Sequence, residues 1–408
     1  MLKKYIKKLC GILLCVCFVF AIHSINFELI FSLTGNDIIT IGNLEKLNLD
    51  KNFGSVVSGQ INESVVTTGN SSVKSTKLTI KLFGFIPIKT VDVVVTPDKT
   101  VYLGGVPLGF SITTKGVIVV GQNSVVSESG NVFVETSQPI KNGDILEKVN
   151  GIDISNIDYI KQSLAESAGN EITLSLIRDG KSYNVKTKPV KDVETGEYKL
   201  GLWVRDDAQG IGTLTFVTEQ NKFGALGHPI CDYETGACVT VGDGDVYNCS
   251  TLGVTKGEKG KAGELRCLFI QGKNSKGEIA KNTNCGVFGT ISDRSQIIDE
   301  NVVAQLGTRM VVRTGDAKII SSVSGIREEY DIEIIKTYRQ PKSGDKSFVF
   351  RVKDPRLISL TGGIVQGMSG SPIVQDGKLI GAVTHVFLYD PTKGYGVYAD
   401  WMFEELDF

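Results

Sequence analysis

Short runs of β-branched and aromatic residues, interrupted by Gly, Asp, Asn and Lys, dominate the second half of the chain. Short runs separated by turn residues are typical of a β-sandwich or a β-barrel, not of strands that alternate with helices. We therefore expect residues 191–408 to form a mainly β domain. The strands predicted there are 210–217, 237–244, 264–270, 286–292, 308–314, 330–338, 346–352, 371–375 and 379–388.

The N-terminal residues follow a different pattern. Four lysines within the first eight residues precede an uncharged apolar run over residues 9–22. Basic residues before an apolar run keep that end of the chain in the cytoplasm, and the length of the run suits a secretion signal or a short spanning helix. No small-x-small cleavage motif follows Ala21. We expect residues 1–30 to be an uncleaved signal or transmembrane anchor, with the remaining chain outside the cytosol.

Residues 31–100 are expected to be an extended N-terminal region. The segment 54–76 is rich in Gly, Asn, Ser and Thr and has no helical period, so we expect it to be exposed and open to proteolysis. The segment 77–95 alternates and is rich in β-branched residues, which predicts strands.

The order of segments over residues 101–190 resembles a PDZ domain. PLGF (107–110) resembles the carboxylate-binding loop of that family, and GDILEKVNGIDI resembles its strand–turn–strand signature; a helical stretch, IDYIKQSLAESAG, and a predicted hairpin follow. The resemblance implies that the amides of Leu108, Gly109 and Phe110 bind a peptide carboxylate, with the peptide added as a strand beside them. The alternative interpretation is a plain β-hairpin.

Composition and charge narrow the possible partners. A length of 408 residues favours two or three domains. Hydrophobic residues make up 41% of the chain and charged residues 22%, which is the balance of a folded protein with a core. The net charge of −1 at pH 7 provides no basic field for nucleic acid. We expect no nucleic-acid partner and no cofactor.

Five cysteines follow the predicted anchor, and an odd number excludes complete pairing within one chain. Two of them lie close to His228, which makes a zinc site conceivable, but the chain has no C-x-x-C pair. We expect no metal, and thiols that are unpaired or partly paired. The cysteines are Cys231, Cys238, Cys249, Cys267 and Cys285.

The segment QGMSGSP (366–372) places serines on a backbone with few side chains around it. GMSGSP resembles the GDSGGP element of chymotrypsin-like proteases, with Ser369 at the nucleophile position. The N–H groups of Gly367 and Ser369 are the candidate oxyanion hole, which would stabilise the charge that develops on a substrate carbonyl. Ser371 is the weaker candidate nucleophile, because no glycine lies two residues before it.

A serine hydroxyl needs a base to become a nucleophile, and the chain has three histidines. His228 lies in KFGALGHPI, where Gly227 and Pro229 predict a turn after a strand, so we expect an exposed and positioned imidazole. His385 lies in a predicted strand and is expected to be structural, and His23 lies at the membrane edge.

A carboxylate should hold the imidazole of the base in one tautomer. Asp354 and Asp293 are both candidates for this role, and the residue pattern alone does not choose between them.

These residues resemble the motifs of a known peptidase family. The segment 361–402 closely resembles the C-terminal signature of the stage IV sporulation protein B peptidases, and GALGHPI resembles their histidine motif. The resemblance covers nearly the whole chain in the order anchor, PDZ domain, peptidase. It implies a chymotrypsin-like double β-barrel over residues 191–408, in which Ser369, His228 and Asp354 are the catalytic residues.

The resemblance also implies a biological role. Such peptidases are exported across the inner forespore membrane of endospore-forming bacteria and stay anchored there, with their domains in the intermembrane space. They cleave themselves near the N-terminus, for which the segment 54–76 is the expected zone. They then cut a membrane-bound regulatory protein, which releases an intramembrane metalloprotease that processes a late mother-cell sigma factor precursor. The PDZ domain binds a peptide ligand and restrains the enzyme.

Two alternatives remain open at the level of sequence. A quality-control protease of the high-temperature-requirement type also joins a trypsin-like domain to a PDZ domain, but in that family the protease comes first. A non-catalytic PDZ adaptor with an inert barrel is the alternative from outside the enzymes.

Overall fold

The chain divides into two compact units, residues 1–99 and 100–408. The predicted anchor lies outside the described residues, and no helix in the described part is long and apolar enough to cross a membrane. The structure, a computed structural model, describes residues 39–41, 57–63, 74–82, 85–95 and 99–408, except for 155, 179, 270–271, 273, 310, 339 and 341.

The first unit contains a four-stranded sheet in the order β1-β4-β3-β2. β3 and β4 form an antiparallel hairpin, which confirms the strands predicted over residues 77–95. β2 occupies part of the segment 54–76 that was predicted to be exposed, and it pairs with β3 in register from Val57 to Glu63. The strands are β1 (Ile39–Ile41), β2 (Val57–Glu63), β3 (Lys74–Leu82) and β4 (Ile86–Val95).

The second unit begins with a barrel whose strands pair in the closed order β6-β15-β16-β21-β20-β17 and back to β6. Its centre is filled by buried aliphatic and aromatic residues such as Phe110, Phe223 and Val246. The barrel strands are β6 (Pro107–Gln122), β15 (Leu202–Val217), β16 (Lys222–Ala225), β17 (Val241–Asn248), β20 (Gly277–Thr283) and β21 (Gly286–Ile291). The short helix η2 (Arg294–Gln296) follows them.

A second closed set of strands follows in the order β23-β24-β25-β29-β28-β27 and back to β23. It has a separate core, built around Phe348, Phe350 and Tyr330. Its strands are β23 (Gly315–Ser321), β24 (Glu328–Thr337), β25 (Phe348–Val352), β27 (Pro372–Gln375), β28 (Lys378–Val386) and β29 (Lys393–Tyr398). β5 (Thr100–Leu103), β22 (Val303–Leu306), α5 (Pro355–Thr361) and α6 (Ala399–Glu404) accompany them. The mainly β prediction is therefore confirmed.

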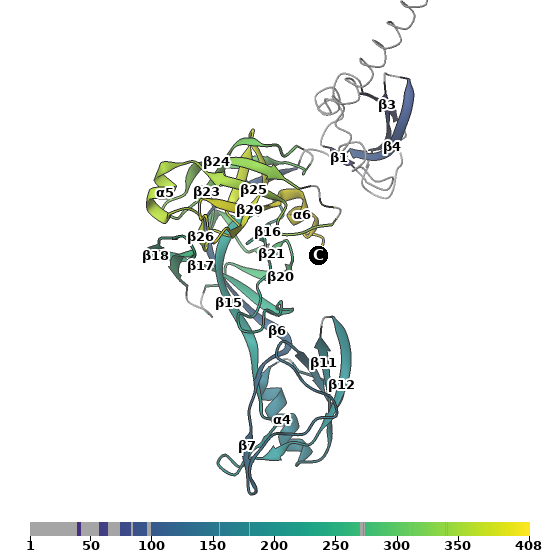
Figure 1. The fold of residues 1–408 in the computed structure, drawn as a ribbon, viewed down its shortest axis with the longest axis vertical. Coiled ribbons are helices and arrows are strands. Elements are labelled where there is room, and N and C mark those ends of the chain that lie inside the picture. Colours follow the sequence, from purple (N-terminus) through teal and green to yellow (C-terminus); the bar gives the residue numbers. More distant parts are fainter. Residues whose placement is uncertain are drawn as a thin grey trace, which may run out of the picture. The chain divides into compact units, whose positions relative to one another are not determined.

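The far halves of β6 and β15 continue out of the first barrel and enter a smaller subdomain (Figure 1). This subdomain has its own core, which runs from Val117 to Leu200 and includes Leu164 of its single described α-helix. The helix predicted from IDYIKQSLAESAG is confirmed, and Asn156 caps its N-terminus. The elements are β7 (Val125–Ser127), β8 (Gly130–Val132), β9 (Ile145–Val149), β10 (Ile152–Asp153), α4 (Ile157–Ser167), β11 (Ile172–Arg178), β12 (Lys181–Thr187), β13 (Val190–Lys191) and β14 (Tyr198–Lys199).

The prediction of a strand at 308–314 is wrong. The described residues of this segment form turns and irregular backbone, in which the amide of Arg309 donates to the Asp400 carboxylate and the amide of Arg313 donates to the Gln375 side chain. Val312 is buried in the second barrel core. The apolar pattern at Val312 therefore arises from burial in the core and not from a strand. The backbone amides of Arg309 and Arg313 donate to side chains instead of to a neighbouring strand.

Candidate active site

His228 stands just after β16, on a sharply turned backbone. Leu226 and Gly227 both have positive φ angles, of 67° and 72°. A side chain at Gly227 would come within 2.9 Å of the Thr384 methyl group, so glycine is needed both for conformation and for space. Leu226 is a non-glycine residue in the left-handed region, which is a strained conformation of the kind that clusters at functional sites. The turn places His228 near the barrel surface, where it is only partly exposed, less than the sequence pattern predicts.

The ring of His228 is held by its own chain. Nδ1 lies 2.9 Å from the carbonyl oxygen of Pro229. A carbonyl oxygen only accepts, so Nδ1 carries the proton and Nε2 is left as the basic nitrogen. Burial lowers the pKa of His228 below its ordinary value, and the Pro229 carbonyl and the Asp345 charge oppose this shift. The imidazole is therefore neutral at pH 7 and able to accept a proton.

Ser369 lies in the turn between β26 (Val365–Gln366) and β27. Gly367 and Gly370 on either side have φ angles of +94° and +93°, which favour glycine at both positions. The neighbours Met368 and Ser371 are fully buried, whereas Ser369 is partly exposed. The turn therefore exposes one serine and hides the other, and the buried Oγ of Ser371 makes no hydrogen bond with any described residue.

Two threonines of β15 hold the serine turn from the first barrel. The Thr213 hydroxyl donates to the Gly367 carbonyl at 2.8 Å, and the Thr213 amide donates to the Ser369 carbonyl at 2.8 Å. The Thr215 hydroxyl donates to the Gly370 carbonyl at 2.7 Å. The Ser369 amide, one of the two predicted oxyanion donors, bonds to no residue in the described part of the chain. That donor is consequently available to a substrate.

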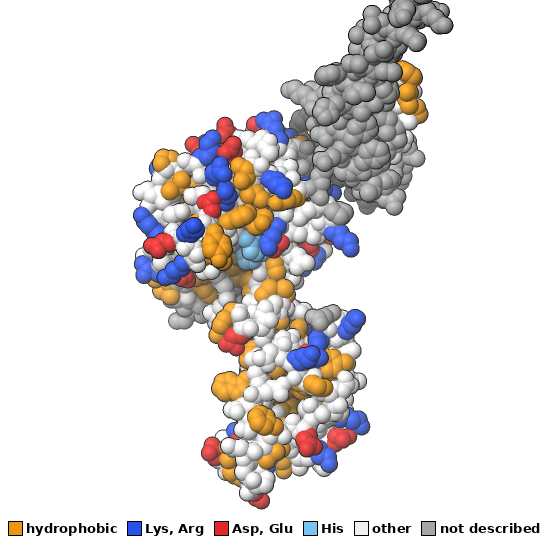
Figure 2. Space-filling model, viewed as in Figure 1, with side chains coloured by type: hydrophobic (Ala, Val, Ile, Leu, Met, Phe, Trp, Pro, Cys, Tyr) orange, Lys and Arg blue, Asp and Glu red, His pale blue; other side chains and the backbone are white. Residues whose placement is uncertain are grey.

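The structure brings the segments of His228 and Ser369 to one place on β28. The Ser369 hydroxyl donates to the Thr384 carbonyl at 2.8 Å, and the His228 ring lies beside the ring of His385, with centroids 5.2 Å apart. Histidine side chains accordingly appear on the surface of this unit, bordered by hydrophobic side chains (Figure 2). The hydroxyl points to Thr384 and not to His228, so proton transfer requires the serine side chain to rotate.

Asp354 and Asp293 have other partners. Asp354 caps the N-terminus of α5 and binds the Arg356 side chain at 2.8 Å, and these hydrogen bonds lower the pKa of Asp354 to about 2. Asp293 caps η2 through the amide and hydroxyl of Ser295. In this geometry neither carboxylate orients His228, because each is engaged by its own local turn.

The carboxylate that faces the histidines is Asp345. Its Oδ2 lies 3.6 Å from Nε2 of His385, and its charge acts on both imidazoles. Thr384 fixes the loop that carries it, because the Thr384 hydroxyl donates to the Asp345 carbonyl at 2.7 Å. Sequence reasoning missed Asp345, which sits in the polar segment KSGDKS and resembles an ordinary turn residue.

His385 differs from the structural histidine that the sequence suggested. Its Nδ1 is buried and makes no hydrogen bond with a residue that the structure describes. Burial lowers the pKa of His385, and the neighbouring His228 adds to this effect. Of the three histidines, His23 lies outside the described residues. The site therefore pairs two imidazoles with one carboxylate.

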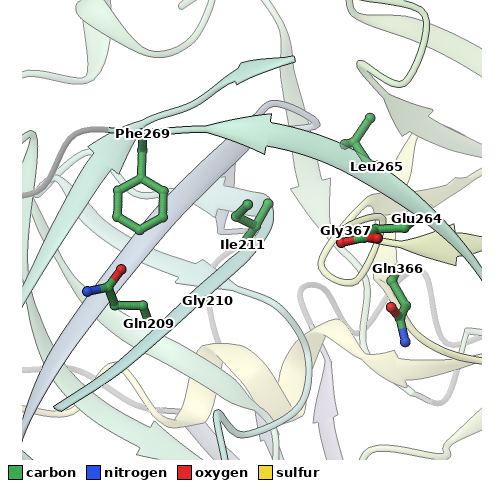
Figure 3. Close-up of a pocket in the computed structure, with 8 residues that line it drawn as sticks. All are labelled: Gln209, Gly210, Ile211, Glu264, Leu265, Phe269, Gln366 and Gly367. Carbon is green, nitrogen blue, oxygen red and sulfur yellow. The ribbon is translucent and has the colours of Figure 1, made fainter. Parts of the chain in front are cut away.

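A cleft of about 350 Å³ opens beside the serine turn. Figure 3 shows Phe269 and Gln209 at one end of it and Glu264, Gln366 and Gly367 at the other. Gly210 and Ile211 of β15 also line it, and β19 (Gly263–Leu268), which pairs with β18 (Ser250–Thr255), contributes Glu264 and Leu265. Because Gly367 lies two residues before Ser369, a substrate side chain next to the scissile bond has room here.

The proposed carboxylate-binding loop is a barrel strand instead. Leu108, Gly109 and Phe110 lie in β6, paired with β15 on one side and β17 on the other. Leu108 and Phe110 are fully buried, and the Phe269 ring packs against Gly109. The loop prediction is wrong because the apolar and glycine pattern that resembled a peptide-binding loop is a closely packed barrel wall.

A protein-family model and solved protein structures match parts of this chain. The family model described as SpoIVB peptidase S55 matches residues 196–403, more than half of the chain, and the match includes both His228 and Ser369. The active form of the Rv3671c protease from M. tuberculosis is 13% identical, with a TM-score of 0.30, over 48% of this chain and 72% of that chain. The inactive form of the Rv3671c protease is also 13% identical, with a TM-score of 0.28, over 48% of this chain and 85% of that chain. The chain belongs to the SpoIVB peptidase S55 family and is a serine peptidase.

Proposed function

We propose that the protein is a self-cleaving serine endopeptidase of sporulation signalling. It cuts a membrane-bound regulatory protein and thereby releases an intramembrane metalloprotease that processes a late mother-cell sigma factor precursor. Family membership supports this role. The observation that carries the catalytic part is the meeting of the His228 and Ser369 segments at Thr384 and His385.

In the proposed mechanism, the Ser369 hydroxyl leaves the Thr384 carbonyl and turns to Nε2 of His228. Nε2 takes the proton as Oγ attacks the peptide carbonyl, and later gives it to the leaving amine. The amides of Ser369 and Gly367 stabilise the oxyanion, at about 3 kcal/mol for each donor. The Pro229 carbonyl holds the reactive tautomer, and the charge of Asp345 stabilises the imidazolium that forms.

The substrate binds as an extended segment along the cleft. Gly210 and Ile211 pair with β6 through one edge of β15 and line the cleft. A peptide added as a strand obtains main-chain hydrogen bonds there and directs alternate side chains into the cleft. Glu264 at the cleft wall favours a basic substrate side chain near the scissile bond.

Residues 1–30 anchor the enzyme in the inner forespore membrane, with the folded units in the intermembrane space. The smaller subdomain acts as a PDZ domain that binds a peptide, through a surface other than Leu108–Phe110. Self-cleavage occurs within residues 54–76, of which β2 occupies Val57–Glu63.

The test compares the N-termini of three purified proteins by mass spectrometry: wild type, Ser369→Ala and Ser371→Ala. We expect new N-termini from the segment 54–76 in the wild type and in Ser371→Ala, and none in Ser369→Ala. Ser371→Ala is the matched control, because it removes a buried hydroxyl that has no partner among the described residues. Cleavage that persists in Ser369→Ala would refute the assignment of the nucleophile.

A further inference from the structure

Two cysteines face each other directly after the catalytic histidine. Cys231 and Cys238 stand opposite one another in a narrow hairpin, here called the cysteine hairpin and comprising residues 230–239. Their sulfur atoms lie 2.9 Å apart. Cys238 is exposed and Cys231 is partly exposed, so a redox partner in solution has access to the pair.

The backbone of the cysteine hairpin is suited to a disulfide bond. The Asp232 amide donates to Ala237 at 2.8 Å, and the Val239 amide donates to Ile230 at 3.1 Å. These bonds flank the cysteines and make them a non-hydrogen-bonded pair, in which the Cα atoms are about 4.5 Å apart. Disulfides bridge Cα separations of about 4.4–6.8 Å. The bond therefore forms without displacement of the chain.

We propose that Cys231 and Cys238 are an oxidative modification site and form a disulfide bond in the mature enzyme. The two thiols give up two protons and two electrons, and a sulfur–sulfur bond forms between them. The acceptor is the disulfide of a thiol–disulfide oxidoreductase or of oxidised glutathione, which is reduced to two thiols. The proposed location outside the cytosol is one in which disulfides form and persist.

The bond would stabilise the part of the chain that orients His228. The side chain of Asn282 already clamps the base of the cysteine hairpin, with 2.8 Å bonds to the Ile230 amide, the Ile230 carbonyl and the Val239 carbonyl. Pro229, whose carbonyl holds the imidazole, immediately precedes this clamp. A disulfide adds a covalent link at the same place, so fewer backbone conformations move the Pro229 carbonyl away from Nδ1.

A residue of the smaller subdomain also contacts the cysteine hairpin, so we expect reduction of the disulfide to weaken the hairpin only in part. Arg205 of β15 pairs with Asp232 and Glu234, and its guanidinium lies 5.2 Å from the Tyr233 ring. These contacts survive when the disulfide is reduced. Reduction should therefore loosen the hairpin without unfolding it.

The other cysteines differ in environment and provide internal comparisons. Cys249 and Cys267 hydrogen-bond to each other, and this bond lowers the pKa of Cys267 to about 7. Cys285 is fully buried, and burial raises its pKa to about 12. Buried thiols with raised pKa values are inert. Burial also raises the pKa of the Cys231 thiol to about 12, but Cys231 is partly exposed. Cys285 is therefore expected to remain reduced because it is fully buried.

The test uses the full chain with Ser369→Ala, so that self-cleavage does not complicate the mapping. The protein is incubated with oxidised glutathione, alkylated without reduction and digested. We expect the peptide that contains Cys231 and Cys238 to carry no alkyl group at either residue and to be lighter by the mass of two hydrogen atoms. Alkylation of both residues, or a bond from either one to Cys249 or Cys267, would overturn the proposal. This readout is independent of any cleavage.

The second measurement addresses the consequence of the bond. We expect the Cys231→Ser/Cys238→Ser double variant to unfold at a midpoint about 5 °C lower than the oxidised parent. Peptide cleavage by the double variant in the active background should have a kcat about 2- to 5-fold lower, with KM unchanged. Dithiothreitol should reproduce both effects in the parent and cause no further change in the double variant. An equal response of the double variant to dithiothreitol would assign the effect to other cysteines.

Discussion

Two carboxylates in the second barrel show how differently the same group is used. Asp354 is buried at the start of α5, where it accepts hydrogen bonds from the Arg356 side chain and from the amides of Arg356 and Asp331. The side chain of Asp345 is 34% exposed and lies 3.6 Å from His385. The first carboxylate is saturated with partners, and the second retains lone pairs directed toward the histidines.

The difference in hydrogen bonding indicates a structural role for Asp354 and a catalytic role for Asp345. A carboxylate with all its acceptor positions filled stabilises the helix start and has little capacity to respond when a charge develops elsewhere. A carboxylate next to an imidazole stabilises that ring when it becomes positively charged. Family resemblance points to Asp354 and the geometry points to Asp345. Four experiments distinguish a structural role of Asp354 from a catalytic role of Asp345 and the histidines.

The largest effect is expected at the histidines. His228→Gln should reduce kcat/KM at least about 10³-fold, because it removes the general base. His385→Gln should reduce kcat/KM by about 10-fold, because the His385 ring contacts His228 but does not receive the serine proton. Both variants are to be compared by cleavage of one peptide substrate. Equal losses in the two variants would mean that His385 is the base or shares that role.

Asp345→Ala should reduce kcat by about 10- to 100-fold, with KM and the unfolding midpoint nearly unchanged. The loop is held by the backbone carbonyl of Asp345, which the substitution keeps. Steady-state kinetics and thermal unfolding of one preparation provide the measurement. Unchanged kcat would exclude Asp345 from catalysis.

Asp354→Ala should show the opposite profile. We expect the free energy of unfolding to fall by about 1–3 kcal/mol, because the cap of α5 and a buried partner of Arg356 are lost. The folded fraction should retain most of the parent kcat. The pKa of Asp354 is lowered from 3.8 to about 2 in the folded protein, so its contribution is complete above about pH 4 and disappears as the pH falls toward 2. Acid titration of unfolding should show this loss in the parent and not in the variant.

The smallest effect is a shift in the pH profile. Burial lowers the pKa of His228 below 6.5, so kcat/KM should rise with pH and level off near or below pH 6.5, where the base is unprotonated. Because the charge of Asp345 raises the pKa of His228, Asp345→Ala should move this acid limb to lower pH by less than about one unit. A shift to higher pH, or the same shift in Asp354→Ala, would contradict the assignment.

Sequence patterns identified the mainly β character, the helix α4 and the segments that carry His228 and Ser369. Each of these depends on local information, such as turn residues around a histidine or glycines around a serine. Asp345 could not be found in this way, because its role depends on the docking of its loop onto Thr384, which lies 39 residues away. PLGF was misassigned for a similar reason, since only the pairing of β6 with both neighbours reveals it as a barrel wall.

The shared strands β6 and β15 make the smaller subdomain a removable insertion. Thr113 and Asp207 are paired across the ladder, and every member of the subdomain core lies between them in sequence. Joining these two positions through a two-residue turn would convert the long ribbon into an ordinary hairpin whose register is already set. A trimmed peptidase of this kind would show by a single excision whether catalysis needs the smaller subdomain and the Arg205 contacts to the cysteine hairpin, and the same junction would accept a foreign module in its place.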